Sequence, residues 1–191
     1  MKEAIVKAFE DSARTKKAFL RDNLETLLLV IEVIAEAFLR GNKLLLFGNG
    51  GSAADAQHIA AEFVNRFRMD RPPLPALSLT TDTSAITSIA NDFDYKEIFA
   101  KQVKALGKEG DVALAISTSG NAANVLAAID ACKKLKIATV GLSGGDAGKM
   151  ARKVDYLLCV SEGKNTARIQ ETHILVGHVI CEMIDRRLFA A

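Results

Sequence analysis

Two side chains suited to acid–base chemistry, His58 and Glu62, lie four residues apart just after a glycine-rich turn. In a helix this spacing places both on one face, one turn apart. An imidazole and a carboxylate placed in this way can exchange protons with a bound molecule, and both are ligands that Zn²⁺ accepts. An exposed polar pair on a helix surface is the alternative, and the spacing alone fits either interpretation.

A second group of candidates lies near the carboxyl end, where Gln170, His173 and His178 interrupt an otherwise apolar helical pattern. Gln170 and His178 are separated by about 12 Å of helical rise, so they can serve one site only if both lean toward it. On spacing alone, His173 can take the place of His178. A histidine on such a helix can also be a core or interface residue with no part in the chemistry.

The turn before His58, residues 48–52, reads Gly-Asn-Gly-Gly-Ser and follows a short apolar run at 43–47. Glycines permit a sharp turn and let a ligand approach main-chain N–H groups closely. Ser52 is predicted to cap the following helix, whose N-terminus would favour an anion or a sugar oxygen. These features predict a ligand site at this turn.

A second polar loop, residues 117–121, reads Ser-Thr-Ser-Gly-Asn and follows another apolar run. Its hydroxyls and the N-terminus of the next helix could hold a phosphate, and the absence of a following lysine excludes a Walker-type nucleotide loop. A hydroxyl-rich turn with a helix cap is the simpler alternative. A third polar pair, Asn91-Asp92, is equally well explained by a helix end or a turn.

The elements that must position these residues are predicted from apolar spacing. Residues 1–40 have helical periodicity that ends near Gly41-Asn42, and their apolar face is large enough that part of it is expected to contact another subunit. The strands are expected at 43–47, 76–79, 111–116, 137–142 and 155–160. The later helices are expected at 52–66, 84–91, 95–106, 122–135, 147–153 and 165–188. This alternation indicates a parallel sheet covered on both faces, with ligands bound beyond the carboxyl ends of its strands.

Length and composition predict one ordinary globular domain over residues 1–191. The chain has 49% hydrophobic and 25% charged residues. A net charge of +2 favours neither nucleic acid nor a membrane surface as a partner. The N-terminal segment lacks the apolar core of a secretory signal, and no early apolar run is long enough to span a membrane. Three widely spaced cysteines in apolar patterns are typical of buried thiols in a reducing compartment, so the expected location is the cytoplasm.

Taken together, the motifs resemble those of the phosphoheptose isomerases, which are sedoheptulose 7-phosphate isomerases of the sugar-isomerase (SIS) superfamily. The resemblance covers essentially the whole chain and is carried, in order, by Phe47-Gly48-Asn49-Gly50-Gly51-Ser52, His58 with Glu62, Asn91-Asp92, Ile116-Ser117-Thr118-Ser119-Gly120-Asn121, and Arg168-Ile169-Gln170-Glu171 with His178. It implies an α/β fold, a three-layer α/β/α sandwich with a five-stranded parallel sheet (the SIS fold) and an N-terminal helical extension. It also implies a homotetramer with active sites at subunit interfaces.

The resemblance implies roles for individual residues. Glu62 and His178 would be the catalytic acid–base pair. The sugar would be contacted by Asn49, Gly50, Gly51, Glu62, Asn91, Asp92 and Gln170, and the phosphate by Ser117, Thr118 and Ser119. One Zn²⁺ per subunit would be held by His58, Glu62, Gln170 and His178. Many family members have a serine where this chain has Ala122, and the lost hydroxyl is worth about 0.5–1.5 kcal/mol of phosphate binding.

The reaction implied converts D-sedoheptulose 7-phosphate to D-glycero-D-manno-heptose 7-phosphate through an enediol, for ADP- or GDP-heptose and lipopolysaccharide or other surface polysaccharide synthesis. A rival is a related protein that binds a bacterial replication initiator, but it lacks counterparts of Glu62 and His178, so these residues favour catalysis. A sugar-phosphate-sensing regulator would carry a DNA-binding module, for which residues 1–40 are not patterned. A different sugar phosphate, such as an N-acetylated hexose phosphate, stays open as the substrate.

Overall fold

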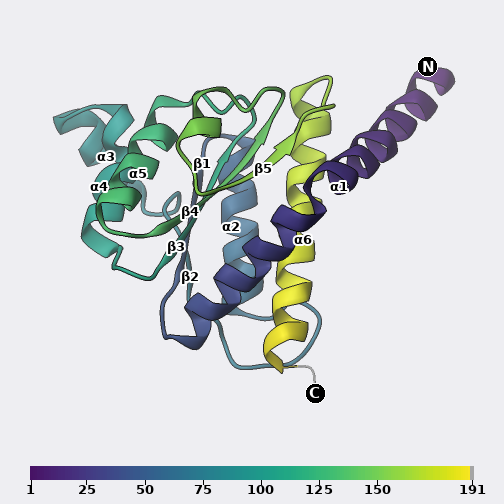
Figure 1. Ribbon diagram of the computed structural model, residues 1–191. Coiled ribbons are helices and arrows are strands. Elements are labelled where there is room, and N and C mark those ends of the chain that lie inside the picture. The colour runs from purple at the N-terminus through teal and green to yellow at the C-terminus, as the bar shows by residue number, and fades with distance from the viewer. Residues whose placement is uncertain (190–191) are drawn as a thin grey trace.

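The computed structural model describes residues 1–189, which fold into a parallel sheet of five strands with helices on both faces (Figure 1). The strands are β1 (Leu44–Gly48), β2 (Ala76–Ser78), β3 (Val112–Ser117), β4 (Ala138–Gly144) and β5 (Tyr156–Val160), in the order β2-β1-β3-β4-β5. The helices are α1 (Lys2–Leu39), α2 (Gly51–Val64), α3 (Thr83–Asp92), α4 (Ile98–Leu106), α5 (Ala123–Lys134) and α6 (Thr166–Phe189), with short 3₁₀ helices η1 (Tyr95–Glu97) and η2 (Gly148–Arg152). The predicted α/β/α sandwich is confirmed.

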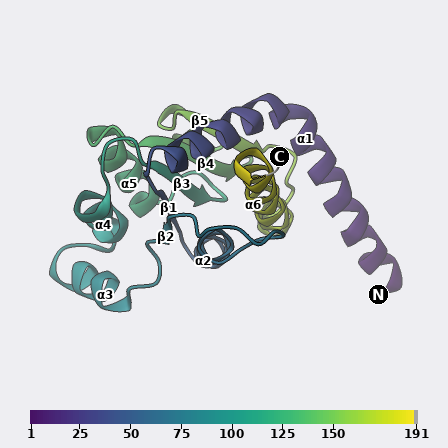
Figure 2. The same ribbon diagram turned by 90° about the horizontal axis from the view of Figure 1, so that it is seen from below.

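The core has two parts, one on each face of the sheet. Helices α1, α2 and α6 cover one face, and α4 and α5 cover the other, with α3 outside them (Figures 1 and 2). Every residue of β1 and β3 is buried because both faces of these central strands are covered. This explains why the strands are continuous apolar runs in the sequence.

Three local predictions differ from the structure. Helix α2 begins at Gly51, so the prediction that Ser52 caps it is wrong; Gly50, with φ +55°, makes the turn, and Ser52 is buried inside the first helical turn. The helix predicted at 147–153 is the 3₁₀ helix η2, preceded by Ala147 at φ +58°. The helix predicted at 95–106 is divided into η1 and α4.

The sheet register brings the polar loops to one edge. Gly48 at the end of β1 pairs with Ile116 of β3, and Ser117 at the end of β3 pairs with Ser143 of β4. All strands run in the same direction, so the segments that follow them leave from the same edge. The loops at 49–51 and 118–121 are therefore neighbours.

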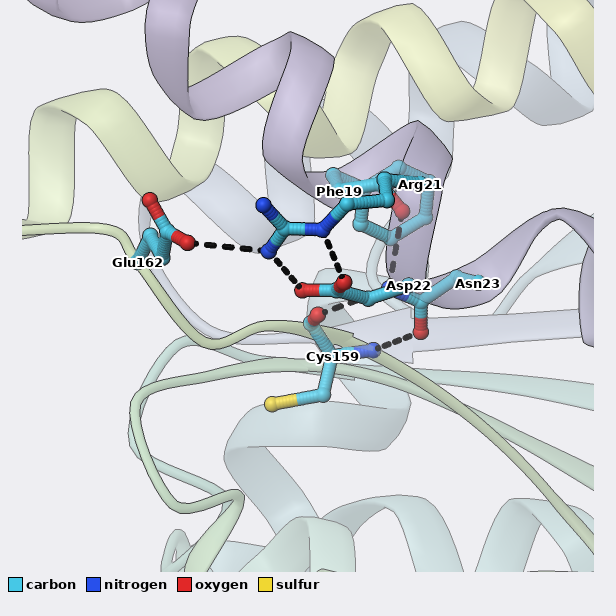
Figure 3. A network of polar contacts seen from close by, with 6 residues as sticks. All are labelled: Phe19, Arg21, Asp22, Asn23, Cys159 and Glu162. Carbon is cyan, nitrogen blue, oxygen red and sulfur yellow. Dashed lines mark hydrogen bonds and ion pairs between the residues drawn. The ribbon is translucent and has the colours of Figure 1, made fainter.

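Helix α1 is attached to the outer strand β5 through a buried asparagine (Figure 3). The Asn23 amide donates to the carbonyl oxygen of Cys159 at 3.1 Å, and the Cys159 N–H donates back to Asn23 Oδ1 at 3.0 Å. Nearby, Arg21 pairs with Asp22 and with Glu162 beyond the strand. One side chain thus satisfies both backbone groups of a residue in the outermost strand.

The first part of α1 extends away from the rest of the molecule (Figures 1 and 2). The first buried residue of this helix is Thr15. Before it, Ile5, Val6 and Phe9 are 54%, 48% and 77% exposed. Among residues 1–189 no helix is both long enough and apolar enough to cross a membrane.

Candidate functional site

Three of the predicted residues meet between α2 and α6. The Nε2 atoms of His58 and His178 are 3.1 Å apart, and Glu62 Oε1 is 3.2 Å from His58 Nε2. Each of the three residues offers one ligand atom within 4.8 Å of the others. The residues at 58 and 62 are one turn apart on α2, and the residue at 178 reaches them from a helix far away in the sequence.

The close contact of these helices depends on a glycine next to His178. A Cβ atom built on Gly177 would lie 2.5 Å from Ile59 Cδ1 and 2.7 Å from its Cγ1. Ile59 is fully buried and directly follows His58. Gly177 therefore lets α6 approach α2 closely beside the two histidines. His58, next to Ile59, and His178, next to Gly177, lie opposite one another as a result.

The surroundings of the cluster are mixed in polarity. Asp55 lies one turn before His58 on α2; burial raises the pKa of its carboxyl group, and the charge of His58 opposes the shift. Its Oδ2 atom is buried and has no hydrogen-bond partner among residues 1–189. On the other side, the ring of Phe67 lies 5.4 Å from that of His178, between centroids. The Glu62 side chain is 25% exposed, so the cluster is open to a ligand.

Gln170 contacts the first polar loop. A Cβ on Gly51 would lie 2.4 Å from Gln170 Nε2, so the amide of Gln170 rests directly on this glycine at the start of α2. Two turns later on the same helix is His178. Helix α6 thus contacts the glycine turn through Gln170 and contributes His178 to the cluster.

Asn49 is held by two residues that sequence reasoning missed. Its amide exchanges two hydrogen bonds with the amide of Asn124, at 2.9 and 2.8 Å, and Asn49 Oδ1 also accepts from the hydroxyl of Tyr95 at 3.2 Å. Asn124 lies 75 residues away at the start of α5, so no local spacing could reveal it. This contact joins the glycine turn to the helix that follows the second polar loop.

The second polar loop is a tight turn. The Gly120 N–H donates to the carbonyl of Ser117 at 3.0 Å, and Gly120 has φ +63° with the carbonyl oxygen of Ala147 so close that a Cβ would not fit. Thr118 is partly exposed and Ser119 is exposed. The N-cap position of α5 is Ala122, whose side chain makes no capping hydrogen bond, while Asn124 Oδ1 accepts from the N–H of Val125 at 2.9 Å. The loop therefore presents hydroxyls beside a helix N-terminus, which suits an anion.

The two histidines of α6 lie in different surroundings. His173 is fully buried, with its Nε2 3.0 Å from the carbonyl oxygen of Ser143, and burial lowers its pKa to about 4. The hydroxyl of Ser143 in turn donates to the carbonyl of Ser117. Because its pKa is low, His173 is a neutral donor at neutral pH, and through Ser143 it is linked to the first residue of the second polar loop, whereas His178 lies in the cluster.

Asn91 and Asp92 are the predicted residues that the structure leaves apart from the cluster. They end α3, are exposed, and hydrogen bond to one another at 2.8 Å. Within the described part of the chain, neither forms a hydrogen bond to α2 or α6. Three residues later, however, Tyr95 in η1 donates to Asn49, so the segment that follows α3 contacts the glycine turn.

The donor set of the cluster fits a zinc ion. Two imidazole nitrogens and a carboxylate oxygen that can turn to one point are ligands that Zn²⁺ prefers, and three protein ligands leave a position open for a substrate oxygen. Gln170, the fourth ligand predicted, has its amide on Gly51 in this structure. The residues present thus fit the metal that the resemblance implies.

Comparisons with known proteins show the family of this chain. A family model for the SIS domain matches residues 8–144. A phosphoheptose isomerase of Thermodesulfovibrio yellowstonii is 50% identical over 189 residues, covering 99% of this chain and 94% of that protein. The solved phosphoheptose isomerases of Neisseria gonorrhoeae and Francisella tularensis superpose with TM-scores of 0.90 and 0.92, at 43% and 36% identity, over 96% of this chain and 98% and 97% of theirs. The chain belongs to the SIS domain family and, within it, to the phosphoheptose isomerases.

Proposed function

We propose that this protein interconverts D-sedoheptulose 7-phosphate and D-glycero-D-manno-heptose 7-phosphate through an enediol. The observation that carries the proposal is the meeting of Glu62 and His178 between α2 and α6, the two helices that also contact each other at the glycine turn through Gln170 and Gly51. Kinship at about 50% identity with phosphoheptose isomerases supports the same substrate. The product would supply ADP- or GDP-heptose for lipopolysaccharide or other surface polysaccharide.

In this proposal Glu62 is the base. Its carboxylate takes a proton from C1 of the ketose, the C–H electron pair forms the C1=C2 bond of the enediol, and the carbonyl π electrons pass to O2. Return of the proton to C2 gives the aldose. His178, within 4.8 Å of the carboxylate, moves the accompanying proton from O1 to O2. Each residue thus returns the proton that it accepts, so the enzyme is unchanged after one turnover, as an isomerisation requires.

Binding is assigned to the polar loops at the carboxyl edge of the sheet. Ser117, Thr118 and Ser119 would donate to the phosphate together with the N-terminus of α5. The sugar hydroxyls would be contacted by Asn49, Gly50, Gly51, Asn91, Asp92 and Gln170. The amide bridge from Asn49 to Asn124 supports this assignment because it couples the sugar-binding turn to the phosphate-binding helix.

We also propose that His58, Glu62 and His178 hold one Zn²⁺ per subunit; Gln170, the fourth ligand that the resemblance implies, has its amide on Gly51, two turns before His178 on α6. When bound, the ion would act as a Lewis acid that polarises the sugar carbonyl and stabilises negative charge on its oxygen. Glu62 and His178 appear in both the ligand set and the proton-transfer pair. Chelation with later zinc restoration therefore tests whether turnover needs the ion or only the two side chains.

A homotetramer in the cytoplasm completes the proposal. The exposed apolar residues Ile5, Val6 and Phe9 support contact between copies through α1, and the site between α2 and α6 is open enough for a neighbouring subunit to complete it. Free thiols at Cys132, Cys159 and Cys181 are consistent with a reducing compartment.

The test is conversion of sedoheptulose 7-phosphate by purified protein in D₂O, followed by NMR before and after chelation and zinc restoration. The aldoheptose phosphate is expected, with deuterium at C2 of the product and at C1 of recovered ketose. An N-acetylated hexose phosphate serves as the comparison substrate and is expected to remain unchanged. Absence of conversion under every metal condition would refute the isomerase and favour a binding protein.

A further inference from the structure

The C-terminus of α2, close to Glu62, is capped by an arginine from outside the helix. The last carbonyls of a helix lack donors within it, and α2 has no basic residue in its last turn. Arg71, in the connection that leads to β2, supplies them: its Nη2 donates to the carbonyl oxygen of Glu62 at 2.9 Å and its Nη1 to that of Phe63 at 2.7 Å. The guanidinium thus bonds directly to the backbone of the proposed base.

The same guanidinium is joined to α6. Arg71 Nε donates to Asp185 Oδ1 at 2.9 Å, and both side chains are buried, with exposed fractions of 1% and 3%. Asp185 lies seven residues, two helical turns, after His178 on α6. The fixed fork of one arginine therefore connects the backbone of Glu62 to the helix that carries its proposed partner.

This ion pair is not the arrangement expected if its only role were to stabilise the fold. A buried pair offsets its desolvation only when the remaining lone pairs are also satisfied. Asp185 Oδ2 is buried and has no hydrogen-bond partner among the residues that the structure describes. An apolar pair of similar volume would hold the two helices together at least as well, but it would leave the carbonyl of Glu62 without its donor.

We propose that Arg71, anchored by Asp185, is a positioning residue of the isomerase, which fixes the Glu62 end of α2 against α6 and so sets the separation of Glu62 and His178. This inference rests on the proposed function, since the two residues matter as a pair only if both act on one substrate. Gly177 determines the distance between α2 and α6 next to the two histidines. Arg71 determines this distance one to two turns further along the helices. Displacement of a reacting group by about 1 Å can lower a rate about 100-fold.

The test replaces both charges at once, in the variant Arg71→Met/Asp185→Leu. Because no unpaired charge is left behind, its Tm is expected to stay near that of the wild type, whereas Arg71→Met alone is expected to lower Tm. We expect kcat of the double variant to fall at least about 10-fold with KM changed less than about threefold, since the phosphate loop follows β3 and does not contact Arg71.

A matched control lies on the same two segments. Arg68 and Glu182 also join the connection after α2 to α6, at 3.2 Å, but the arginine side chain is 69% exposed. The variant Arg68→Met/Glu182→Leu is expected to keep the wild-type kcat. Arg71→Lys provides a second measurement: an ammonium can pair with Asp185 but cannot also follow the geometry of both carbonyls, so kcat is expected to fall while the fold is kept.

The outcomes separate the inference from the function it rests on. If the wild type does not convert sedoheptulose 7-phosphate, the proposed function fails, and positioning is then measured by Zn²⁺ titration of the metal-free protein, where the Arg71 variants are expected to bind at least about 10-fold more weakly. A folded double variant, or a folded Arg71→Lys variant, with wild-type kcat and wild-type Zn²⁺ affinity would overturn the positioning role.

Discussion

At the scale of single residues, Glu62 makes contacts through both its side chain and its backbone. Its carboxylate is 3.2 Å from His58, its backbone carbonyl accepts from Arg71, and its side chain is 25% exposed. Both its orientation and its access to solvent are therefore constrained by neighbours outside α2. A carboxylate in this position can bind a cation and can also accept a carbon-bound proton, and substitution distinguishes these uses.

Replacement Glu62→Gln keeps the size and polarity of the side chain and removes its basicity. We expect turnover of sedoheptulose 7-phosphate to fall by at least about 100-fold, as is typical when a general base is removed, with Tm within a few degrees of the wild type. Initial rates by NMR measure the effect. Glu109→Gln, an exposed carboxylate paired with Lys136, is the control, and wild-type turnover in Glu62→Gln would exclude this residue as the base.

His173 predicts a specific acid sensitivity. Its folded-state pKa of about 4 lies below the ordinary value of 6.5, so the unfolded chain takes up a proton before the folded one does. The stability from this residue is complete above pH 6.5 and is lost as the pH falls toward 4. Between pH 7 and pH 5 the wild type is expected to lose about 2 kcal/mol of unfolding free energy through this group.

The variant His173→Gln retains a side-chain N–H for the Ser143 carbonyl but cannot be protonated. Urea unfolding at pH 7 and pH 5 is expected to show a smaller loss in this variant than in the wild type. From pH 7 to pH 8 the two proteins are expected to change in parallel, since His173 is neutral in both states there. Equal acid losses in both proteins would contradict the role of the buried imidazole.

At the scale of elements, the contact between α2 and α6 determines the site. Gly177→Ala would place a methyl group 2.5 Å from Ile59 Cδ1, which forces the helices apart and costs about 1–3 kcal/mol. Because His178 is the next residue, we expect kcat to fall together with Tm. Adding Ile59→Ala makes room for the methyl group and is expected to recover part of the lost kcat; no recovery in a folded double variant would show that this contact does not position His178.

At the scale of the whole molecule, the projecting part of α1 leads to a prediction about association. Phe9 is 77% exposed on a segment that packs on little of its own chain, so Phe9→Glu is expected to yield a smaller species than the wild type in light scattering. Leu106→Glu, at an exposed leucine on α4, is the control and is expected to leave the assembly unchanged. A wild-type mass for Phe9→Glu would remove this helix from the interface.

The sequence predicts the order of strands and helices and the edge where the loops gather, because each strand is an apolar run followed by a helical pattern. It predicts the pair His58 and Glu62 from their spacing. It could not choose between His173 and His178, since which face of α6 meets α2 depends on Gly177. It could not reveal Arg71, whose partners are main-chain carbonyls and a carboxylate 114 residues away.

The hydrogen bonds between Asn23 and Cys159 also keep strands of other chains from pairing with the edge of this sheet. Strand β5 is the outer strand on its side, and an open outer strand is a template on which another chain can add a strand and start an aggregate. Asn23 occupies the place of that added strand by using both backbone groups of Cys159. A chain shortened to begin at residue 15 keeps this protection, whereas one that begins at residue 31 exposes β5 and is expected to form insoluble, β-rich material.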